Sequence, residues 1–252
     1  MTHPFATRQI PFFLTAAAPC PYLPGQWERK IFTRIEIGEG PALNDALTHA
    51  GFRRSQGVLY RPACEACDAC KSVRVDASRF DWKRRWRKIL NRNADLVVST
   101  EAQTATMEQY ELLTRYLDSR HGDGDMAGMS FGEYVMMVEE GAQRTHVAEY
   151  RDASGTLVAA ALTDVLKDGL SLIYSYFDPD EEKRSAGAYM ILDAVRQAEA
   201  AGLPFVYLGY WVRSSGKMSY KAAYQPLQVL TQSGWQAYAE LDIHEGEDDE
   251  TA

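Results

Sequence analysis

Residues 171–205 read SLIYSYFDPDEEKRSAGAYMILDAVRQAEAAGLPF. The stretch begins with Leu172–Phe177, a short apolar and aromatic run that is typical of a strand. Asp178-Pro179-Asp180 interrupts this run, and an Asp oxygen there can accept from the first free backbone N–H groups of a helix. The sequence therefore predicts a strand that turns directly into a helix.

The predicted helix covers residues 181–200, because Tyr189, Leu192, Val195 and Ala198 recur close to one helical face. Gly202 is suited to a left-handed stop, and Pro204 cannot continue a helix. A second strand follows at residues 205–208. Strand, helix and strand together predict one unit with a crossover helix.

The first turn of this helix holds Arg184 and Gly187 among small residues. A helix N-terminus offers free N–H groups and a positive dipole end, and an Arg side chain adds a fork-shaped cation. These features favour a phosphate site. The alternative is an ordinary crossover helix with a solvated Arg.

The composition describes a globular chain of 252 residues, with 46% hydrophobic and 25% charged residues. The net charge of −8 falls to −1 when the seven acids of residues 239–252 are set aside. The folded body is thus nearly neutral, and the low isoelectric point does not exclude nucleic acid as a partner. We expect the acidic tail to be disordered. No apolar run is long enough to span a membrane and no signal peptide is evident, so the expected location is cytoplasmic.

Three cysteines recur at three-residue intervals, and only one other cysteine is present in the chain; the four are Cys20, Cys64, Cys67 and Cys70. Thiolates this close together repel one another unless they are protonated or shared by a soft metal. The spacing matches the first three ligands of a bacterial ferredoxin pattern, but Arg74 stands at the fourth position. An iron–sulfur cluster or zinc held by the four cysteines is one interpretation. A thiol cluster without metal is the other.

A basic amphipathic helix is predicted from Arg79 to about Asn91. Trp82, Trp86 and Ile89 form its apolar face, and seven cations oppose one acid over residues 79–92. Phosphate backbones are the natural partner of such a surface. We therefore predict a nucleic-acid-binding face made by Lys83, Arg84, Arg85, Arg87, Lys88 and Arg92. The alternative is a solvated helix, paired with the acidic tail.

The second half of the chain predicts two helices, three successive strands, a helix and a strand. This order resembles the acyl-transfer core of GNAT enzymes. The fold class is therefore expected to be α+β, with a GNAT-like core at residues 103–238, a smaller N-terminal α/β region at residues 1–102 that carries the cysteine cluster, and the acidic tail at residues 239–252.

The chain also resembles bacterial aminoacyl-tRNA–protein transferases, the leucyltransferase branch related to eukaryotic arginyltransferases. The motifs that carry this resemblance are CPYLP at 20–24, GFRRS at 51–55, YRPxCxxCxxC at 60–70, YLDxRH at 116–121, LTDV at 162–165, YFDP at 176–179, YLGYWV at 207–212 and KMxYK at 217–221. They cover about residues 10–236. The eukaryotic relatives carry a Cys-x-x-Cys pair associated with iron–sulfur binding, and here Leu23 stands at the second of those positions.

The resemblance implies transfer of leucine from Leu-tRNA to proteins that begin with Asp or Glu, which marks them for N-end-rule degradation. No cofactor is required for such an acyl transfer. The implied partners are aminoacyl-tRNA and these acceptor proteins, with no membrane involved. We expect the site to be a pocket formed by residues 171–221.

Within this pocket we predict a proton acceptor among Asp164, Tyr174 and Tyr176. Arg184 and Gly187 would hold the phosphates at the tRNA 3′ end, and the basic helix at residues 83–92 would hold the tRNA acceptor stem. An acidic N-terminal side chain needs a cation, for which an Arg fork is suited. Arg74, Lys217 and Lys221 are the first candidates, and Arg53, Arg54 and Arg61 are the others.

Two further functions fit parts of the sequence. An acetyl-CoA-dependent N-acetyltransferase would explain Arg184-x-x-Gly187, although Tyr189 occupies the position where that motif has a small residue. A metal-bearing nucleic-acid-binding regulator would explain the cysteines and the basic helix, but not the acyl-transfer core.

Overall fold

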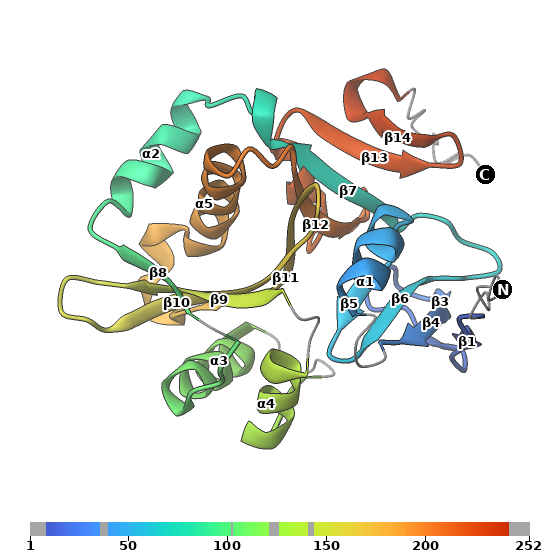
Figure 1. Cartoon of the computed structure of the whole chain (residues 1–252), viewed down its shortest axis with the longest axis horizontal. Helices are drawn as coiled ribbons and strands as arrows, with labels where there is room; N and C mark the ends of the chain where they lie inside the picture. Colours follow the sequence, from blue (N-terminus) through green and yellow to red (C-terminus); the bar gives the residue numbers. More distant parts are fainter. Residues whose placement is uncertain (1–8, 36–39, 102, 121–125, 141–143, 242–252) are drawn as a thin grey trace, which may run out of the picture.

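The structure is a computed structural model of the chain, and it describes residues 9–35, 40–101, 103–120, 126–140 and 144–241. Figure 1 shows a mixed α+β arrangement in which helices cover both faces of one large sheet. The helices are α1 (Gly40–His49), α2 (Arg84–Arg92), α3 (Met107–Arg120), α4 (Phe131–Glu139) and α5 (Ala186–Ala200), and the 3₁₀ turns are η1 (Ala77–Arg79), η2 (Pro179–Arg184), η3 (Ser219–Ala223) and η4 (Tyr238–Glu240). The expected α+β class is confirmed.

The large sheet has eight strands, and only the β11–β12 pair is parallel. Its order is β14 (Gly234–Ala237), β13 (Leu227–Thr231), β7 (Lys71–Asp76), β12 (Phe205–Trp211), β11 (Gly169–Phe177), β10 (Leu157–Val165), β9 (Thr145–Arg151) and β8 (Val97–Glu101). The parallel pair follows from the α5 crossover, because a parallel neighbour needs a long connection. The element order expected for a GNAT-like core, from two helices to the final strand, is present.

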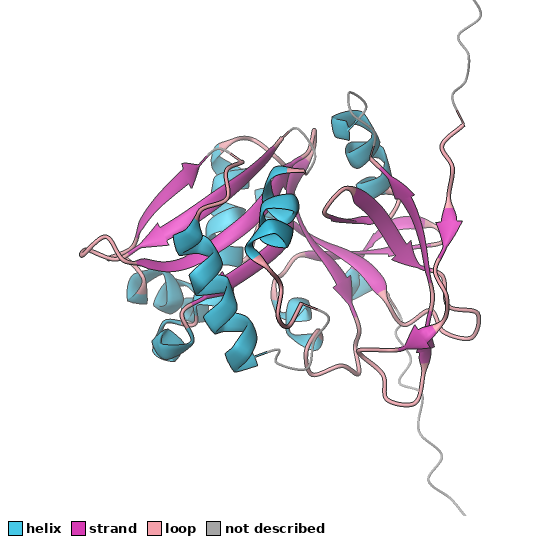
Figure 2. Ribbon diagram, turned by 90° about the horizontal axis from the view of Figure 1, so that it is seen from below, coloured by secondary structure: helices cyan, strands magenta, loops and turns pink. Residues whose placement is uncertain are grey.

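A smaller sheet, made of strands from the first 62 residues, lies beside the large one (Figure 2). Its order is β1 (Phe13–Leu14), β4 (Lys30–Arg34), β6 (Val58–Pro62) and β5 (Arg53–Ser55), and a separate two-stranded ribbon joins β2 (Ala18–Pro19) to β3 (Trp27–Glu28). The large sheet takes β7 and β8 from the first 102 residues. The expected division near residue 102 therefore does not separate the two sheets.

Side chains alternate between the two faces of each strand, so the large sheet has a hydrophobic core on both faces. On β10, Ala160 and Leu162 pack against α3 and α4, whereas Ala159 and Ala161 face α5. Helix α4 begins at Phe131 because Ser130 and Glu133 form a reciprocal capping box. In the described part of the chain, no helix is both long and apolar enough to cross a membrane.

Two predicted helices begin later than expected. The segment after β11 is first the turn η2, and Ser185, with φ of 56°, separates it from α5. Before α2, the Asp76 carboxylate accepts from Ser78 Oγ and Arg79 Nε and closes η1 as a separate turn. Arg184 and Lys83 therefore lie just outside the helices to which the sequence assigned them.

Candidate active site

The candidate site is the opening between β11 and β12. These strands pair only where Gly169–Ser171 meets Phe205–Tyr207, although β11 continues to Phe177 and β12 to Trp211. Beyond that point the facing backbone groups of the two strands do not pair with each other. Such groups need other hydrogen-bond partners, so the opening is a place where side chains from elsewhere can enter.

Arg53 of β5 enters this opening over Gly209. The register of β12 against β7 shifts between Tyr207 and Gly209, and Gly209 has φ of 74°. A Cβ atom on Gly209 would lie only 1.2 Å from Arg53 Nη1, so a glycine is needed where the guanidinium passes. Arg53 Nη2 donates to the carbonyl oxygens of Leu172 and Ile173, each at 3.0 Å. The small sheet thus places a cation on the unpaired edge of β11.

Lys221 of η3 is the second cation at the opening. Its side chain is buried, and its ammonium group donates to the Tyr210 carbonyl oxygen. Burial, together with the positive charge of Arg53, lowers the pKa of Lys221 to about 7. Among the described residues, neither Arg53 nor Lys221 forms an ion pair with a carboxylate.

Three tyrosines from separate elements lie near one another, and one of them, Tyr220 of η3, lies near Arg53. Tyr116 of α3 and Tyr174 of β11 pack against the core beneath α3 and α4. Burial raises the pKa of Tyr116 and Tyr174, so these two phenols stay protonated at neutral pH. Tyrosines in this state can donate hydrogen bonds but cannot act as bases.

Asp164 lies away from this chemistry, in a buried ion pair. Its carboxylate accepts from Arg54 Nε at 2.7 Å and Arg54 Nη2 at 2.8 Å, and also from Asn44 Nδ2 at 2.9 Å and Thr145 Oγ1 at 2.7 Å. The residue is 1% exposed. These bonds fix α1 and β5 to the large sheet and leave the carboxylate little freedom to take a substrate proton.

Tyr176 belongs to a buried hydrogen-bond network beneath α3 and α4. Its hydroxyl lies 2.7 Å from that of Tyr134, which donates to Gln109 Oε1, and Gln109 Nε2 donates to Glu149. Burial raises the pKa of Tyr176 far above its ordinary value. This placement suits a structural role better than the predicted role of proton acceptor.

The predicted phosphate site at α5 is occupied by the protein's own acids. Arg184 donates through Nη1 and Nη2 to Asp95, at 2.9 and 3.0 Å, and through Nε to Glu181 at 2.8 Å. Gly187 lies in the first turn of α5, where an added Cβ would make ordinary contact with Phe177. Since its guanidinium is already paired, Arg184 is poorly placed to hold the tRNA phosphates.

Two of the three predicted acid-reading cations lie outside the opening. Arg74 stacks on Phe205 at 3.5 Å and on Trp235 at 4.4 Å, and it donates to Gln228 and Tyr207. Lys217 is exposed. Only Lys221 of that set reaches the opening. Arg53, which the sequence analysis placed among the second-choice cations, lies at the opening, and Gly209 inside the predicted strand is the sequence signal of that close approach.

Helix α2 lies beside α5 at the edge of the molecule (Figure 1), and its five cations are exposed. Trp86 is 5% exposed and stacks on Tyr224 with ring centroids 4.7 Å apart, and Arg85 donates to the Ala223 carbonyl oxygen. Other cations make local contacts: Arg87 donates to Trp82, Arg92 donates to Lys183, and Lys83 pairs with Asp81. Arg84 and Lys88 are exposed. The predicted tRNA face therefore adjoins η3, which carries Lys221.

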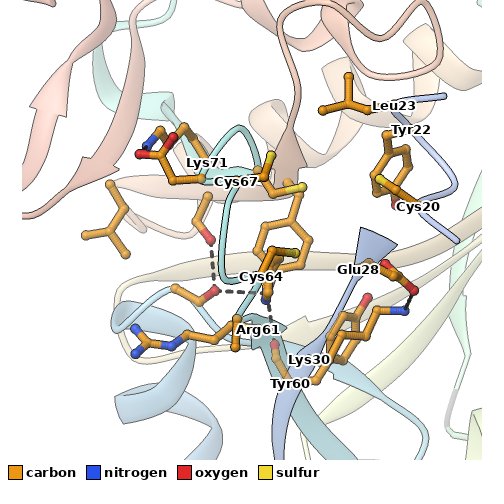
Figure 3. Close-up of a pocket in the computed structure, with 18 of the residues that line it drawn as sticks. Cys20, Tyr22, Leu23, Glu28, Lys30, Tyr60, Arg61, Cys64, Cys67 and Lys71 are labelled. Carbon is orange, nitrogen blue, oxygen red and sulfur yellow. Dashed lines mark hydrogen bonds and ion pairs between the residues drawn. The ribbon is translucent and has the colours of Figure 1, made fainter. Parts of the chain in front are cut away.

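The four cysteines line one cavity of about 400 Å³ beside the small sheet (Figure 3). Burial, and then the nearby thiols of Cys20, Cys64 and Cys67, raise the pKa of Cys70 to about 11. Within the described residues, no group of three or more His, Cys, Asp or Glu side chains is arranged to hold a metal ion. The fold brings Cys20 beside the other three thiols, which is the condition for a four-cysteine site, but the described residues give no support for zinc or an iron–sulfur cluster there.

Comparison with known proteins matches both halves of the chain to one family. Residues 18–88 match the family model for the N terminus of arginine-tRNA-protein transferase, and residues 108–231 match the model for its C terminus. Among solved structures, a tandem GNAT protein from the clavulanic acid biosynthesis pathway has a TM-score of 0.42 and 12% identity, over 84% of this chain and 59% of that one.

Curated relatives match over almost the entire length. A protein of Maricaulis maris (strain MCS10) is 84% identical over 99% of this chain and 98% of its own length, and is named aspartate/glutamate leucyltransferase. A protein of Caulobacter vibrioides (strain NA1000 / CB15N) with the same name is 54% identical over 93% of this chain and 86% of its own length. The chain therefore belongs to the aminoacyl-tRNA–protein transferase family, in the branch of the aspartate/glutamate leucyltransferases.

Proposed function

We propose that this protein transfers leucine from Leu-tRNA to the N-terminal amine of proteins that begin with Asp or Glu, and so marks them for degradation. The observation that carries this proposal is the 84% identity with the Maricaulis maris aspartate/glutamate leucyltransferase over almost the full length of both chains. The reaction would take place in the cytoplasm, where aminoacyl-tRNA is available.

The reaction depends more on the correct placement of the amine beside the leucyl ester than on a strong base. The leucyl ester is already activated, and an α-amine with a pKa of about 8 is about 10% neutral at pH 7. The amine nitrogen attacks the ester carbonyl, the new C–N bond replaces the C–O bond, and the ribose oxygen leaves with a proton that the amine gives up. No cofactor and no metal enter this balance.

We assign the reaction to the opening between β11 and β12. Tyr174 lies on β11, one residue after the carbonyl groups that Arg53 contacts, and its phenol is kept protonated by burial. A protonated tyrosine there is suited to donate a hydrogen bond to the oxyanion that develops on the ester carbonyl. Asp164 and Tyr176, which are engaged in buried networks, would support this site rather than exchange protons with the substrate.

The tRNA would dock on α2 and deliver its 3′ end across η3. Arg84, Lys88 and the other outward cations of α2 would contact backbone phosphates. The inner side of the helix touches the stretch that follows Lys221, through Arg85 with Ala223 and Trp86 with Tyr224. A stem held on α2 therefore lies next to the proposed site of transfer.

The test is a transfer assay with purified protein and radiolabelled Leu-tRNA. Peptides that begin with Asp or Glu should become labelled, and peptides that begin with Lys should not. A parallel reaction with acetyl-CoA tests the N-acetyltransferase alternative. Acetylated peptide without leucylated peptide would overturn the proposal, and tRNA binding without any transfer would favour the regulator.

A further inference from the structure

We propose that Arg53 and Lys221 together form the site that binds the side-chain carboxylate of the acceptor's N-terminal Asp or Glu. The inference rests on the proposed function and names the two cations that would read the acidic residue. They come from distant parts of the chain, β5 and η3, and they meet only in the folded protein.

Arg53 has donors to spare. Its Nη2 serves the Leu172 and Ile173 carbonyl oxygens, while Nε and Nη1 find no hydrogen-bond partner among the described residues. The side chain is half-buried, so water satisfies these donors poorly. A carboxylate accepts from an Arg fork through two parallel hydrogen bonds, which makes it the ligand that these nitrogens suit.

Lys221 adds a second positive charge to the proposed binding site. It is 6% exposed, and of its three ammonium protons one is given to the Tyr210 carbonyl oxygen. Two cations placed together in a buried site repel each other, and an anion bound between them removes that cost. An acidic side chain supplies such an anion, whereas the neutral Asn and Gln side chains do not.

The other two buried cations among the described residues lie near the protein's own acids: Arg54 pairs with Asp164, and Arg74 lies near Asp168. The half-buried Arg184 is likewise paired, with Asp95 and Glu181. Arg53 and Lys221 differ from them in that no carboxylate of the described residues reaches them. The substrate is therefore the natural source of the missing negative charge.

The position of the two cations also serves the reaction. In Asp or Glu the side-chain carboxylate is separated from the α-amine by only a few bonds. A carboxylate bound at Arg53 would therefore hold the amine beside Tyr174, on the edge of β11 where the leucyl ester is proposed to lie. Binding of the acidic side chain would thus position the α-amine of the acceptor for attack on the ester.

The test compares Glu-starting and Gln-starting peptides, which match in shape but differ in charge. In the wild-type protein, kcat/KM should favour Glu strongly. Arg53→Gln and Lys221→Met should each lower kcat/KM for the Glu peptide by about 10- to 150-fold. Both should lower the slow reaction of the Gln peptide by a much smaller factor, so that the ratio of the two kcat/KM values falls. Arg53→Lys should restore part of the preference.

The control variant is Arg34→Gln, which removes an exposed cation from β4 of the same small sheet. It should keep the wild-type ratio. An unchanged KM for Leu-tRNA in each variant shows that the protein is folded. If Arg53→Gln and Lys221→Met both keep the wild-type preference for Glu, the proposed carboxylate site is wrong. If the wild-type protein leucylates neither peptide, the proposed function itself has failed.

Discussion

Two adjacent arginines on β5, Arg53 and Arg54, lie in different surroundings, and we give them different roles. Successive side chains on a strand point to opposite faces. Arg54 is 2% exposed and points into the buried pair with Asp164, whereas Arg53 points into the β11–β12 opening and, among the described residues, donates hydrogen bonds to carbonyl groups only. The sequence motif GFRRS cannot separate these two roles, because they depend on which partner the fold brings to each face.

The first prediction concerns Asp164. Replacement by Asn leaves Arg54 buried without its counter-ion, so the free energy of unfolding should fall by about 3–5 kcal/mol. Denaturant unfolding followed by circular dichroism measures this free energy. Asp180→Asn is the control, because its carboxylate is 89% exposed and lies 3.8 Å from Arg115; it should cost less than about 1 kcal/mol. Equal losses in the two variants would show that the buried pair is not structural.

The second prediction concerns Lys221 and pH. Its pKa is about 7 in the folded protein, below that of an unfolded lysine, so the unfolded state binds more protons between pH 7 and 10. Stability should therefore rise with pH in this window, by at most about 1.4 kcal/mol per unit. Lys221→Met removes this contribution, so the difference in unfolding free energy between variant and wild type should shift with pH. A difference that stays constant from pH 6 to 10 would mean that Lys221 is solvated.

At the scale of elements, the local patterns predicted strands and helices well where packing agreed with periodicity. Helix α1, the β5–β6 hairpin and the β11–α5–β12 unit follow from turn residues and apolar spacing. The later starts of α2 and α5 did not, because they depend on Asp76 closing its own turn and on Ser185 adopting a left-handed conformation. The opening between β11 and β12 is also a tertiary property, visible in the sequence only as Gly209.

The third prediction tests that glycine. Gly209→Ala puts a Cβ onto the Arg53 guanidinium and also strains a positive φ, whereas Gly202→Ala has a similar φ of 68° with nothing within 4 Å. Both should lose about 1 kcal/mol or more from backbone strain. Only Gly209→Ala should also lose the preference for Glu over Gln peptides, because Arg53 must move. Retention of that preference in Gly209→Ala would place Arg53 outside the acceptor site.

The fourth prediction concerns α2 as a docking face. Arg84→Glu combined with Lys88→Glu should raise the KM for Leu-tRNA and should lower the salt dependence of tRNA affinity, by roughly 0.7–0.9 in log–log slope for each lost phosphate contact. Filter binding over a salt series measures this. The exposed pair Arg34→Glu and Lys167→Glu is the matched control. The docking assignment is wrong if both double variants weaken tRNA binding equally.

At the scale of the whole molecule, the sequence predicted the class, the family and the order of the core. It could not predict how the small sheet meets the large one. That junction brings Arg53 to β11, Arg54 to Asp164, and Cys20 to the other thiols. It also explains why the predicted site residues have different surroundings: Lys221 lies at the opening, whereas Arg74, Arg184 and Asp164 are held by partners elsewhere.

The central claim is that leucine is transferred at the opening between β11 and β12. The most direct measurement is a crystal structure with an acceptor-stem RNA that ends in a 3′-leucylamido-adenosine, whose amide linkage cannot be cleaved as the ester is. We predict density for the leucyl group beside Tyr174 and for the RNA stem along α2. A leucyl group bound outside the opening between β11 and β12 would contradict the account.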